Sequence, residues 1–296
     1  MQDATDLPVI VTGASGQLGR LVLKELLDIR GVPADQIIAT TRTPGHLAEF
    51  AARGVQVREA DFDRPDLLPV AFAGGRRMLV ISTTPELDGH PRMRRQMDAI
   101  EAGVKAGVDH IIYTSAANPE PGTPCFWKAE HYETELALIN SGATWTILRN
   151  WDYPDWHLAE DWSEALETGR YFTMRGEGRS NHITREDCAR AAAGALLSPI
   201  SANRRFDVTG PEALTAEEIM AILGDVAGKK IEVVHCSEEE LRRRYEARGI
   251  NPLFIPFLLG FNIGVRQGRY DGITNAVEQL SGSRPTDLRT WLEGTL

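Results

Sequence analysis

Short apolar runs alternate with helical periodicity through the first half of the chain. The run Leu7–Thr12 is apolar over most of its length, which is typical of a strand buried on both faces of a sheet. In Gln17–Ile29 apolar residues recur every three or four positions, which predicts an amphipathic helix. Five more strands are expected, with helices between them, at Ile37–Thr41, Val55–Arg58, Met78–Ser82, His110–Thr114 and Thr144–Leu148. This alternation predicts an α/β fold with a doubly wound parallel Rossmann sheet.

The second half of the chain is less regular. The aromatic-rich segment Trp151–Thr168 is expected to be helical, and Thr or Ser followed three residues later by an acid opens three further helices at Thr184, Thr215 and Ser237. We expect a dinucleotide-binding domain over residues 1–155, to which residues 183–210 return. Residues 156–182 and 211–296 then form a smaller C-terminal α/β substrate-binding region. The cleft between the two parts is the expected site.

The charge balance limits the classes of partner. The 296 residues include 32 Lys plus Arg and 42 Asp plus Glu, so the formal net charge is −10. An acidic chain lacks the electrostatic field that attracts phosphate backbones or anionic lipid, which disfavours nucleic acid and membrane surfaces. The longest apolar run, residues 252–265, is too short and too interrupted for a membrane span.

Cysteine usage points to a reducing compartment. Cys125, Cys188 and Cys236 form no CxxC pair, so neither a disulfide framework nor a zinc site is expected. His157 likewise has no partner at metal-ligand spacing, and we expect no metal. The beginning of the chain shows no basic and apolar secretory signal. These features predict a cytoplasmic protein.

The first strand runs into a glycine-rich turn that opens a helix, Gly13-Ala-Ser-Gly16-Gln-Leu-Gly19. In a dinucleotide site the first glycine permits the tight turn, the second lets the backbone approach the pyrophosphate, and the third allows close packing of helix on strand. The pyrophosphate then lies against the N–H groups of the helix N-terminus. The strand-turn-helix context favours a cofactor site over a turn that serves packing alone.

The end of the second strand indicates which cofactor binds. Residues 37–45 contain no acid for a ribose 2′-OH, and Arg42 stands where a partner for a 2′-phosphate is expected, which favours NADP(H). A solvated surface arginine is the alternative. Asp61 and Phe62 follow the third strand, where they suit the adenine, although Asp61 could equally cap the next helix.

Polar residues also follow the fourth and fifth strands. Ser82 and Thr83 come after one, and Thr114 and Ser115 after the other. Because the carboxyl edge of an open α/β sheet faces the ligand, we expect all four to line the cofactor site.

Several segments in order carry a family resemblance. They are the glycine motif, Arg42, Ala60-Asp61-Phe62, residues 106–115, the run from Glu130 to Glu135, and residues 146–150. Together they resemble the NmrA-like atypical short-chain dehydrogenases/reductases over nearly the whole chain. The resemblance implies an NADPH-dependent reductase that transfers hydride to a quinone-like or other aromatic acceptor. Azo or triphenylmethane-type substrates are an alternative within the same chemistry, and a nonenzymatic NADP(H)-sensing regulator is an alternative of another class.

The resemblance also assigns residues to roles. It implies that the pyrophosphate is held by Gly13, Ser15, Gly16, Gln17 and Leu18. It implies further that Arg42 holds the 2′-phosphate, that Asp61 and Phe62 flank the adenine, and that Ser82 and Thr83 contact the adjoining ribose. Asn150, Trp151 and Tyr153 are then expected near the nicotinamide. The family often has a glycine where Trp151 stands, which leaves the shape of the substrate pocket open.

The sequence offers several candidates for the residue that donates a proton to the substrate. The Tyr-x-x-x-Lys of the main short-chain branch is absent, because Pro124 stands four residues before Lys128. Lys128, His131 and Tyr153 are the candidate catalytic residues. A solvated Lys128 paired with Glu135, and a His131 that only packs beneath the sheet edge, are the alternatives. Quinones and cationic dyes need little acid, so positioning alone could suffice.

Four large aromatic residues follow the sixth strand within twelve positions. Trp151, Tyr153 and Trp156 are candidates for substrate binding, since aromatic walls suit a flat aromatic substrate. Trp162 belongs to the same group, and ordinary core packing is the alternative for all four. We therefore expect a small-molecule aromatic substrate and no nucleic acid or membrane partner. A homodimer is a possible assembly.

Overall fold

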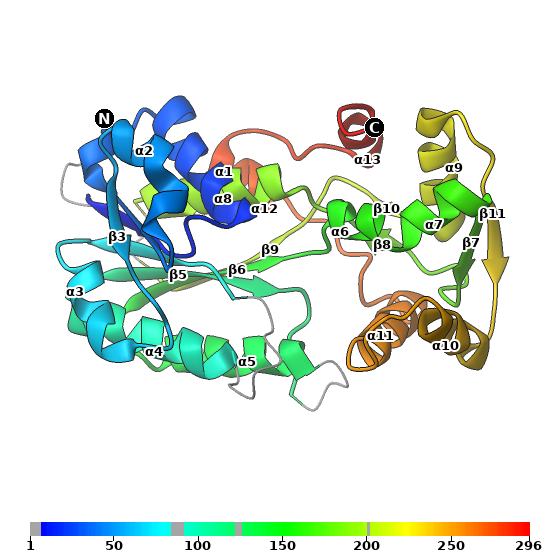
Figure 1. Cartoon of the computed structure of the whole chain (residues 1–296), viewed down its shortest axis with the longest axis horizontal. Coiled ribbons are helices and arrows are strands. Elements are labelled where there is room, and N and C mark those ends of the chain that lie inside the picture. Colours follow the sequence, from blue (N-terminus) through cyan, green and yellow to red (C-terminus); the bar gives the residue numbers. More distant parts are fainter. Residues whose placement is uncertain (1–6, 84–91, 122–125, 200–201) are drawn as a thin grey trace.

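A seven-stranded parallel sheet forms the centre of the computed structural model, which describes residues 7–83, 92–121, 126–199 and 202–296 (Figure 1). In spatial order its strands are β3 (Gln56–Glu59), β2 (Ile37–Thr41), β1 (Val9–Val11), β4 (Arg77–Val80), β5 (His110–Ala116), β6 (Thr144–Asn150) and β9 (Arg204–Val208). All neighbours are parallel. The order reverses between β1 and β4, which is the switch point where doubly wound folds bind ligands. The predicted fold class is confirmed.

Helices cover both faces of the sheet (Figure 1). One layer contains η3 (Ala34–Gln36), η4 (Pro44–Leu47), α2 (Ala48–Ala52), α1 (Gln17–Lys24) with its π-helical extension η2 (Glu25–Ile29), α8 (Arg185–Leu197) and α12 (Ala276–Ser281). The other contains η5 (Pro65–Leu67), α3 (Leu68–Phe72), α4 (Arg92–Lys105) and α5 (Phe126–Ile139). The side chains of β1 alternate between these two cores, and all three are fully buried, as the apolar run predicted.

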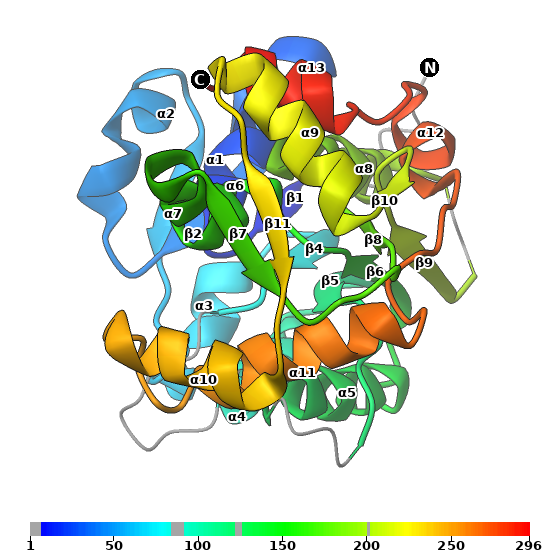
Figure 2. The ribbon, with the colours of Figure 1, turned by 90° about the vertical axis from the view of Figure 1, so that its right-hand side faces the viewer.

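The second region packs beside the carboxyl edge of the sheet (Figure 2). Its strands form two short pairs, β7 (Arg170–Thr173) parallel to β11 (Glu232–His235), and β8 (Ser180–Asn181) antiparallel to β10 (Ala213–Leu214). Its helices are α6 (Pro154–Ala159), α7 (Asp161–Thr168), α9 (Ala216–Ala227), α10 (Glu238–Ala247), α11 (Ile255–Arg266) and α13 (Leu288–Glu293). One of its two cores surrounds the fully buried Trp162.

All three predicted helix caps are confirmed, although only one of the two capping boxes expected at Thr215 and Ser237 is complete. Thr184, Thr215 and Ser237 each accept a hydrogen bond from the backbone N–H three residues later, which satisfies a donor of the first helical turn. At Thr215 the reciprocal bond from its own N–H to the Glu218 carboxylate completes a capping box.

One expectation about the second half needs correction, and one helix was not predicted. Trp151–Thr168 does not form one helix, because Glu160 leaves helical geometry with φ −113° and ψ −98° and separates α6 from α7. The apolar run near residues 252–265 contains the helix α11, which helical spacing did not reveal because the run is apolar on nearly every side. None of the helices in the described ranges has the length and apolar character that crossing a bilayer requires.

Candidate active site

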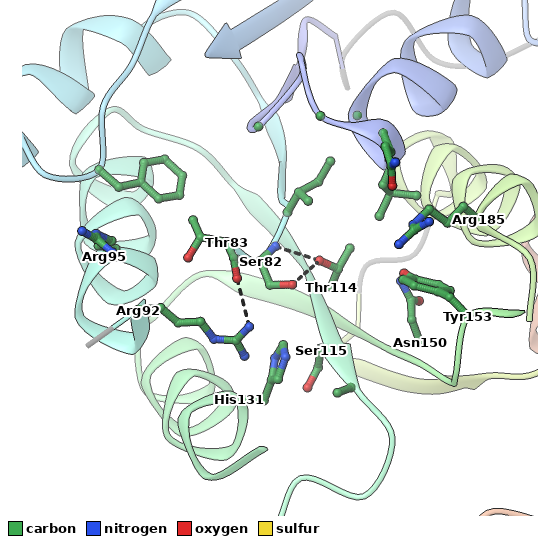
Figure 3. Close-up of a pocket in the computed structure, with 18 of the residues that line it drawn as sticks. Ser82, Thr83, Arg92, Arg95, Thr114, Ser115, His131, Asn150, Tyr153 and Arg185 are labelled. Atoms are coloured by element: carbon green, nitrogen blue, oxygen red, sulfur yellow. Dashed lines mark hydrogen bonds between the residues drawn. The ribbon is translucent and has the colours of Figure 1, made fainter. Parts of the chain in front are cut away.

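A cavity of about 600 Å³ follows the carboxyl edge of the sheet from the β1–α1 turn to the second region (Figure 3). Every residue that the sequence singled out for the cofactor, the substrate or catalysis lines it. The cavity therefore brings together segments from six strand ends with the aromatic segment after β6. Trp162 does not line the cavity, so core packing is the correct interpretation for this member of the aromatic group.

The glycine turn has the geometry that a pyrophosphate needs. Gly13 has φ +58°, in the left-handed region that favours glycine. A Cβ at Gly19 would lie 2.5 Å from the Gly13 carbonyl oxygen and 2.7 Å from the Ala14 Cα, so only glycine allows this approach of helix to turn. No side chain caps α1, and its first turn carries no acid. The N–H groups of the first turn are thus available for an anion.

The far end of this part of the cavity is polar and positive. Ser15 and Thr41 join the β1–α1 turn to the end of β2 through a hydroxyl–hydroxyl hydrogen bond of 2.7 Å. The next residue, Arg42, is exposed and lines the cavity. Arg42 therefore stands beside the turn, in the position from which a guanidinium meets a ribose 2′-phosphate.

Asp61 does not cap the helix that follows it. The Asp61 Oδ1 accepts a hydrogen bond from the Asp63 N–H at 3.1 Å, while η5 begins at Pro65 without any side-chain cap. The helix-cap alternative is therefore wrong. Asp63 in turn pairs with the buried Arg95 of α4 at 2.7 Å. This network fixes the β3 loop at the cavity wall, beside Phe62.

Hydrogen bonds order the polar ends of β4 and β5 (Figure 3). The Ser82 N–H donates to Thr114 Oγ1 at 2.9 Å, and the Thr114 hydroxyl donates to Ser82 Oγ at 3.3 Å. Arg92 donates to the Thr83 carbonyl at 2.9 Å. The Ser115 hydroxyl donates to the Glu135 carboxylate of α5 at 2.6 Å, so it also ties this strand end to the helix.

Glu135 is not the partner of Lys128. It accepts two hydrogen bonds from the Arg149 guanidinium of β6, at 2.9 and 2.8 Å, and is almost fully buried. Lys128 is also buried, with 8 % of its surface exposed, and donates to the Tyr270 hydroxyl. The expectation of a solvated lysine paired with Glu135 is therefore wrong, because α5 turns Lys128 into the cavity and Glu135 toward the sheet.

His131 lies one turn after Lys128 and faces the same cavity (Figure 3). Its Nδ1 shares a hydrogen bond of 2.7 Å with the hydroxyl of Tyr113. Burial, followed by the charges of Arg92 and Lys128, lowers the pKa of His131 well below its ordinary value. The folded protein therefore holds His131 neutral at physiological pH.

This burial has a consequence for stability. An unfolded histidine binds a proton below about pH 6.5, whereas folded His131 does not, so its contribution costs stability as the pH falls from 7 to 5. Replacing it in a His131→Gln variant should reduce the loss of unfolding free energy over this range by about 2 kcal/mol. Urea denaturation at both pH values measures this difference. An unchanged pH dependence would show that folded His131 titrates normally.

Tyr153 comes immediately before α6 and lies between Asn150 and Arg185 in the cavity (Figure 3). Its hydroxyl accepts a hydrogen bond from Asn150 Nδ2 at 3.0 Å, and the Arg185 guanidinium lies 4.6 Å from its ring centre. Burial, together with the neighbouring Cys188, raises the pKa of Tyr153 well above its ordinary value. This environment makes Tyr153 a poor acid and suits it to positioning a ligand.

A buried polar cluster lies behind the aromatic end of the cavity. Asp152 lines the cavity and accepts a hydrogen bond from His157, while His182 Nε2 lies 4.0 Å from the same carboxylate. Burial opposes ionisation of Asp152, yet the nearby His157 lowers its pKa overall. One carboxylate oxygen of Asp152 and one ring nitrogen each of His157 and His182, atoms of the kind that hold a metal ion, lie within 4.8 Å of one another. Sequence spacing could not reveal this group, because His182, the residue after β8, meets Asp152 through an isolated β-bridge.

The structure also adds residues that the sequence did not suggest. Phe257 and Phe261 of α11 and Tyr270 beyond it line the cavity, as do Arg92, Arg95 and Arg185. The rings of Phe261 and Tyr270 meet edge to face, with centres 4.7 Å apart, and Tyr270 meets Trp151 in the same manner at 6.4 Å. For these aromatic residues the only signal in the sequence was the dense aromatic and apolar composition after residue 252.

Comparison with known proteins agrees with this geometry. Residues 13–199 match the model of a family described as NAD(P)H-binding. Quinone oxidoreductase 2 of Escherichia coli is 31 % identical over 95 % of this chain and 96 % of its own. The NAD(P)H azoreductase of Xenophilus azovorans is 28 % identical over 82 % of both chains. The crystal structure of Citrobacter sp. triphenylmethane reductase complexed with NADP(H) superposes with a TM-score of 0.87, at 32 % identity, covering 97 % of this chain and all of that one.

The fold and the lined cavity define a nucleotide-dependent oxidoreductase of the Rossmann class. The chain belongs to the NAD(P)H-binding, NmrA-like family. The resemblance inferred from the sequence is confirmed.

Proposed function

We propose that the protein is an NADPH-dependent reductase that transfers hydride to a quinone-like or other aromatic acceptor. One observation carries the proposal: a single cavity joins the glycine turn of β1–α1 to an aromatic end built by Trp151, Tyr153 and Trp156. The residues between these two ends would hold a cofactor along the sheet edge, and its hydride would then be supplied beside those rings. The quinone, azo and triphenylmethane reductases among its relatives act on flat aromatic compounds by their names, which supports the same substrate class.

The residues present fit NADPH, which when bound supplies the hydride. The uncapped first turn of α1 would hold the pyrophosphate through Gly16, Gln17 and Leu18. Ser82 and Thr83 would contact the ribose region, and Thr114, Ser115 and Asn150 would line the edge near the nicotinamide. Asp61 and Phe62 would flank the adenine. These side chains would hold the cofactor along the carboxyl edge of the sheet.

Arg42 should determine the preference for NADPH over NADH. In the Arg42→Ala variant the Kd for NADPH should rise about 10- to 100-fold, since a charged hydrogen bond contributes about 1.5–3 kcal/mol, while the Kd for NADH should stay unchanged. Fluorescence titration with both cofactors measures the two values. Arg53→Ala is the matched control, because Arg53 pairs with Asp28 on the surface. Equal losses for both cofactors would remove Arg42 from the 2′-phosphate site.

The aromatic end favours an enzyme over a cofactor sensor. A sensor would present the Trp and Tyr side chains to a partner, whereas Trp151 is only 8 % exposed and lines an internal wall with Tyr153 and Trp156. Trp151 fills space that a glycine at this position would leave open, so the pocket is narrower there. Such walls orient a flat acceptor and exclude water, which supplies much of the rate of a hydride transfer.

The three sequence candidates for proton transfer differ in their surroundings. His131 is neutral and shares a hydrogen bond with Tyr113. Tyr153 accepts a hydrogen bond from Asn150, and its raised pKa makes it hard to ionise. Lys128 is buried in the cavity and contacts a second titratable group. We therefore propose Lys128 as part of the catalytic machinery, with His131 and Tyr153 in positioning roles.

The activity is tested by following the absorbance of NADPH at 340 nm with a panel of quinones, triphenylmethane dyes, azo compounds and aromatic carbonyl compounds. The proposal expects oxidation of NADPH that depends on at least one of these acceptors. Tight NADPH binding with no turnover on any of them would instead support a sensor.

The wider setting of the enzyme follows from the same features. We place it in the cytoplasm, in keeping with the free thiols of Cys188 and Cys236. We assign residues 1–155 together with 183–210 to the dinucleotide-binding domain, and residues 156–182 and 211–296 to the smaller substrate-binding region. A homodimer stays an expectation, which analytical ultracentrifugation tests against the chain mass of 32.7 kDa.

A further inference from the structure

A tyrosine far along the chain meets the lysine of the cavity. Lys128, in the first turn of α5, donates a hydrogen bond to the hydroxyl of Tyr270, which follows α11. The Lys128 Nζ also lies 4.3 Å from the centre of the Tyr270 ring. Both side chains line the cavity, and each is 8 % exposed. The contact spans 142 residues of sequence, so no local motif could reveal it.

The fold holds Tyr270 firmly in this place. Its carbonyl accepts a hydrogen bond of 2.8 Å from the Asn181 N–H of β8. Its ring lies between Phe261 and Trp151, edge to face with both. A Cβ at Gly264 would lie 2.5 Å from the ring, so α11 can approach this closely only with glycine there. The ring is thus packed on several sides, and its hydroxyl is directed to the lysine.

We propose that Tyr270 is the catalytic acid of this enzyme, that Lys128 holds the phenolate it leaves, and that the acceptor is an aromatic carbonyl compound, quinones included. The proposal rests on the proposed function, which supplies the reductant. It reproduces, from two distant segments, the tyrosine and lysine chemistry whose local motif is missing from the chain. It extends the role of Lys128 from a lone donor to the partner of a phenol.

Reduction of a carbonyl acceptor requires one hydride and one proton. The acceptor gains a hydride, that is two electrons and one hydrogen nucleus, from NADPH, and its carbonyl oxygen takes up negative charge. The O–H bond of Tyr270 breaks, and a new O–H bond forms on that oxygen. The phenolate is stabilised by the Lys128 ammonium until water returns a proton to it. A triphenylmethane carbocation needs no such proton, because hydride addition alone neutralises it.

This difference between acceptors provides the kinetic test. Wild-type and Tyr270→Phe enzymes are assayed with NADPH on 1,4-naphthoquinone, on an aromatic aldehyde and on a triphenylmethane dye. The ratio of the carbonyl rate to the dye rate should fall about 100-fold in Tyr270→Phe, the usual contribution of a positioned acid. Tyr171→Phe, a buried tyrosine of β7 outside the cavity, is the matched control and should leave the ratio unchanged. Equal losses on all acceptors would assign Tyr270 to packing and overturn the proposal.

A spectroscopic titration separates the dyad from the activity. Tyrosinate absorbance near 295 nm is followed against pH in the protein without cofactor. Burial raises the pKa values of Tyr113, Tyr153, Tyr171 and Tyr245, so these rings stay neutral while a lysine-stabilised phenol ionises. The sixth tyrosine, Tyr132, is removed by carrying out every titration in a Tyr132→Phe background. We expect one tyrosine to ionise below pH 10, absent in Tyr270→Phe, moved upward by at least one pH unit in Lys128→Met, and restored in Lys128→Arg. The same upward shift is expected for the alkaline limb of kcat/KM.

The outcomes separate a failure of the proposed function from a failure of the Tyr270–Lys128 pair. A wild-type enzyme that reduces none of the acceptors refutes the proposed function, while the titration still decides whether the Tyr270–Lys128 pair exists as described. A titration in which Tyr270→Phe removes no low ionisation overturns the dyad even if the enzyme is active. A low ionisation that Lys128→Met leaves in place would overturn the role of the lysine.

Discussion

The Gly19→Ala variant should lose most of its affinity for NADPH while it remains folded. The added Cβ would fall 2.5 Å from the Gly13 carbonyl oxygen and within 3 Å of the Ala14 backbone. These are backbone atoms that no rotamer change can move, so the turn itself has to shift. Overpacking of this kind costs about 3 kcal/mol at its upper end. Since the strain falls on the groups that receive the pyrophosphate, we expect the Kd for NADPH to rise about 100-fold.

Isothermal titration calorimetry measures this change. Gly260→Ala in α11 is the matched control, because a Cβ there meets nothing within 4 Å and alanine favours a helix. An unaltered Kd in Gly19→Ala, with the control behaving as expected, would mean that the β1–α1 turn does not hold the cofactor. Circular dichroism of both variants verifies that the fold is retained.

The Glu135→Ala variant should lower the free energy of unfolding by about 3 kcal/mol, since breaking a buried ion pair leaves an uncompensated charge. Glu135 accepts a hydrogen bond from the Ser115 hydroxyl and forms a bidentate ion pair with the Arg149 guanidinium. It connects α5 to the ends of β5 and β6. The same change should weaken catalysis, because α5 also carries Lys128 and His131.

Urea denaturation at pH 7 gives the free energy. Glu133→Ala is the control, since Glu133 lies on the exposed side of the same helix and should cost little. Glu135→Gln should fall between the two, because the amide keeps a hydrogen bond to Ser115 but loses the charge. A Glu135→Ala protein as stable as Glu133→Ala would show that the pair contributes nothing.

The sequence predicted the sheet and the cofactor side of the site because both depend on local patterns. The apolar run of β1, the glycine turn and the polar strand ends occur within short stretches, and parallel strands bring all their carboxyl ends to one edge. Arg42 and Asp61 could be placed for the same reason. Only the residues at the strand ends had to be identified, since the parallel topology then brings them together at the carboxyl edge of the sheet.

The acceptor side resisted prediction because it is assembled from distant segments. Tyr270 reaches Lys128 across 142 residues, and His182 reaches Asp152 through an isolated β-bridge. No periodicity encodes these contacts. Lys128 shows the limit clearly: its sequence neighbours suggested a solvated lysine near Glu135, whereas helix rotation and the packing of α11 decide that it is buried.

The most direct measurement is a crystal structure of the protein with NADP⁺ and an aromatic acceptor analogue. The account predicts the pyrophosphate against the Gly13–Leu18 turn and the 2′-phosphate at Arg42. The nicotinamide is expected at Asn150 and the analogue against the aromatic end formed by Trp151, Tyr153 and Trp156, with its oxygen toward the Tyr270 hydroxyl. A nucleotide bound elsewhere, or a nicotinamide directed away from the aromatic end, would contradict it.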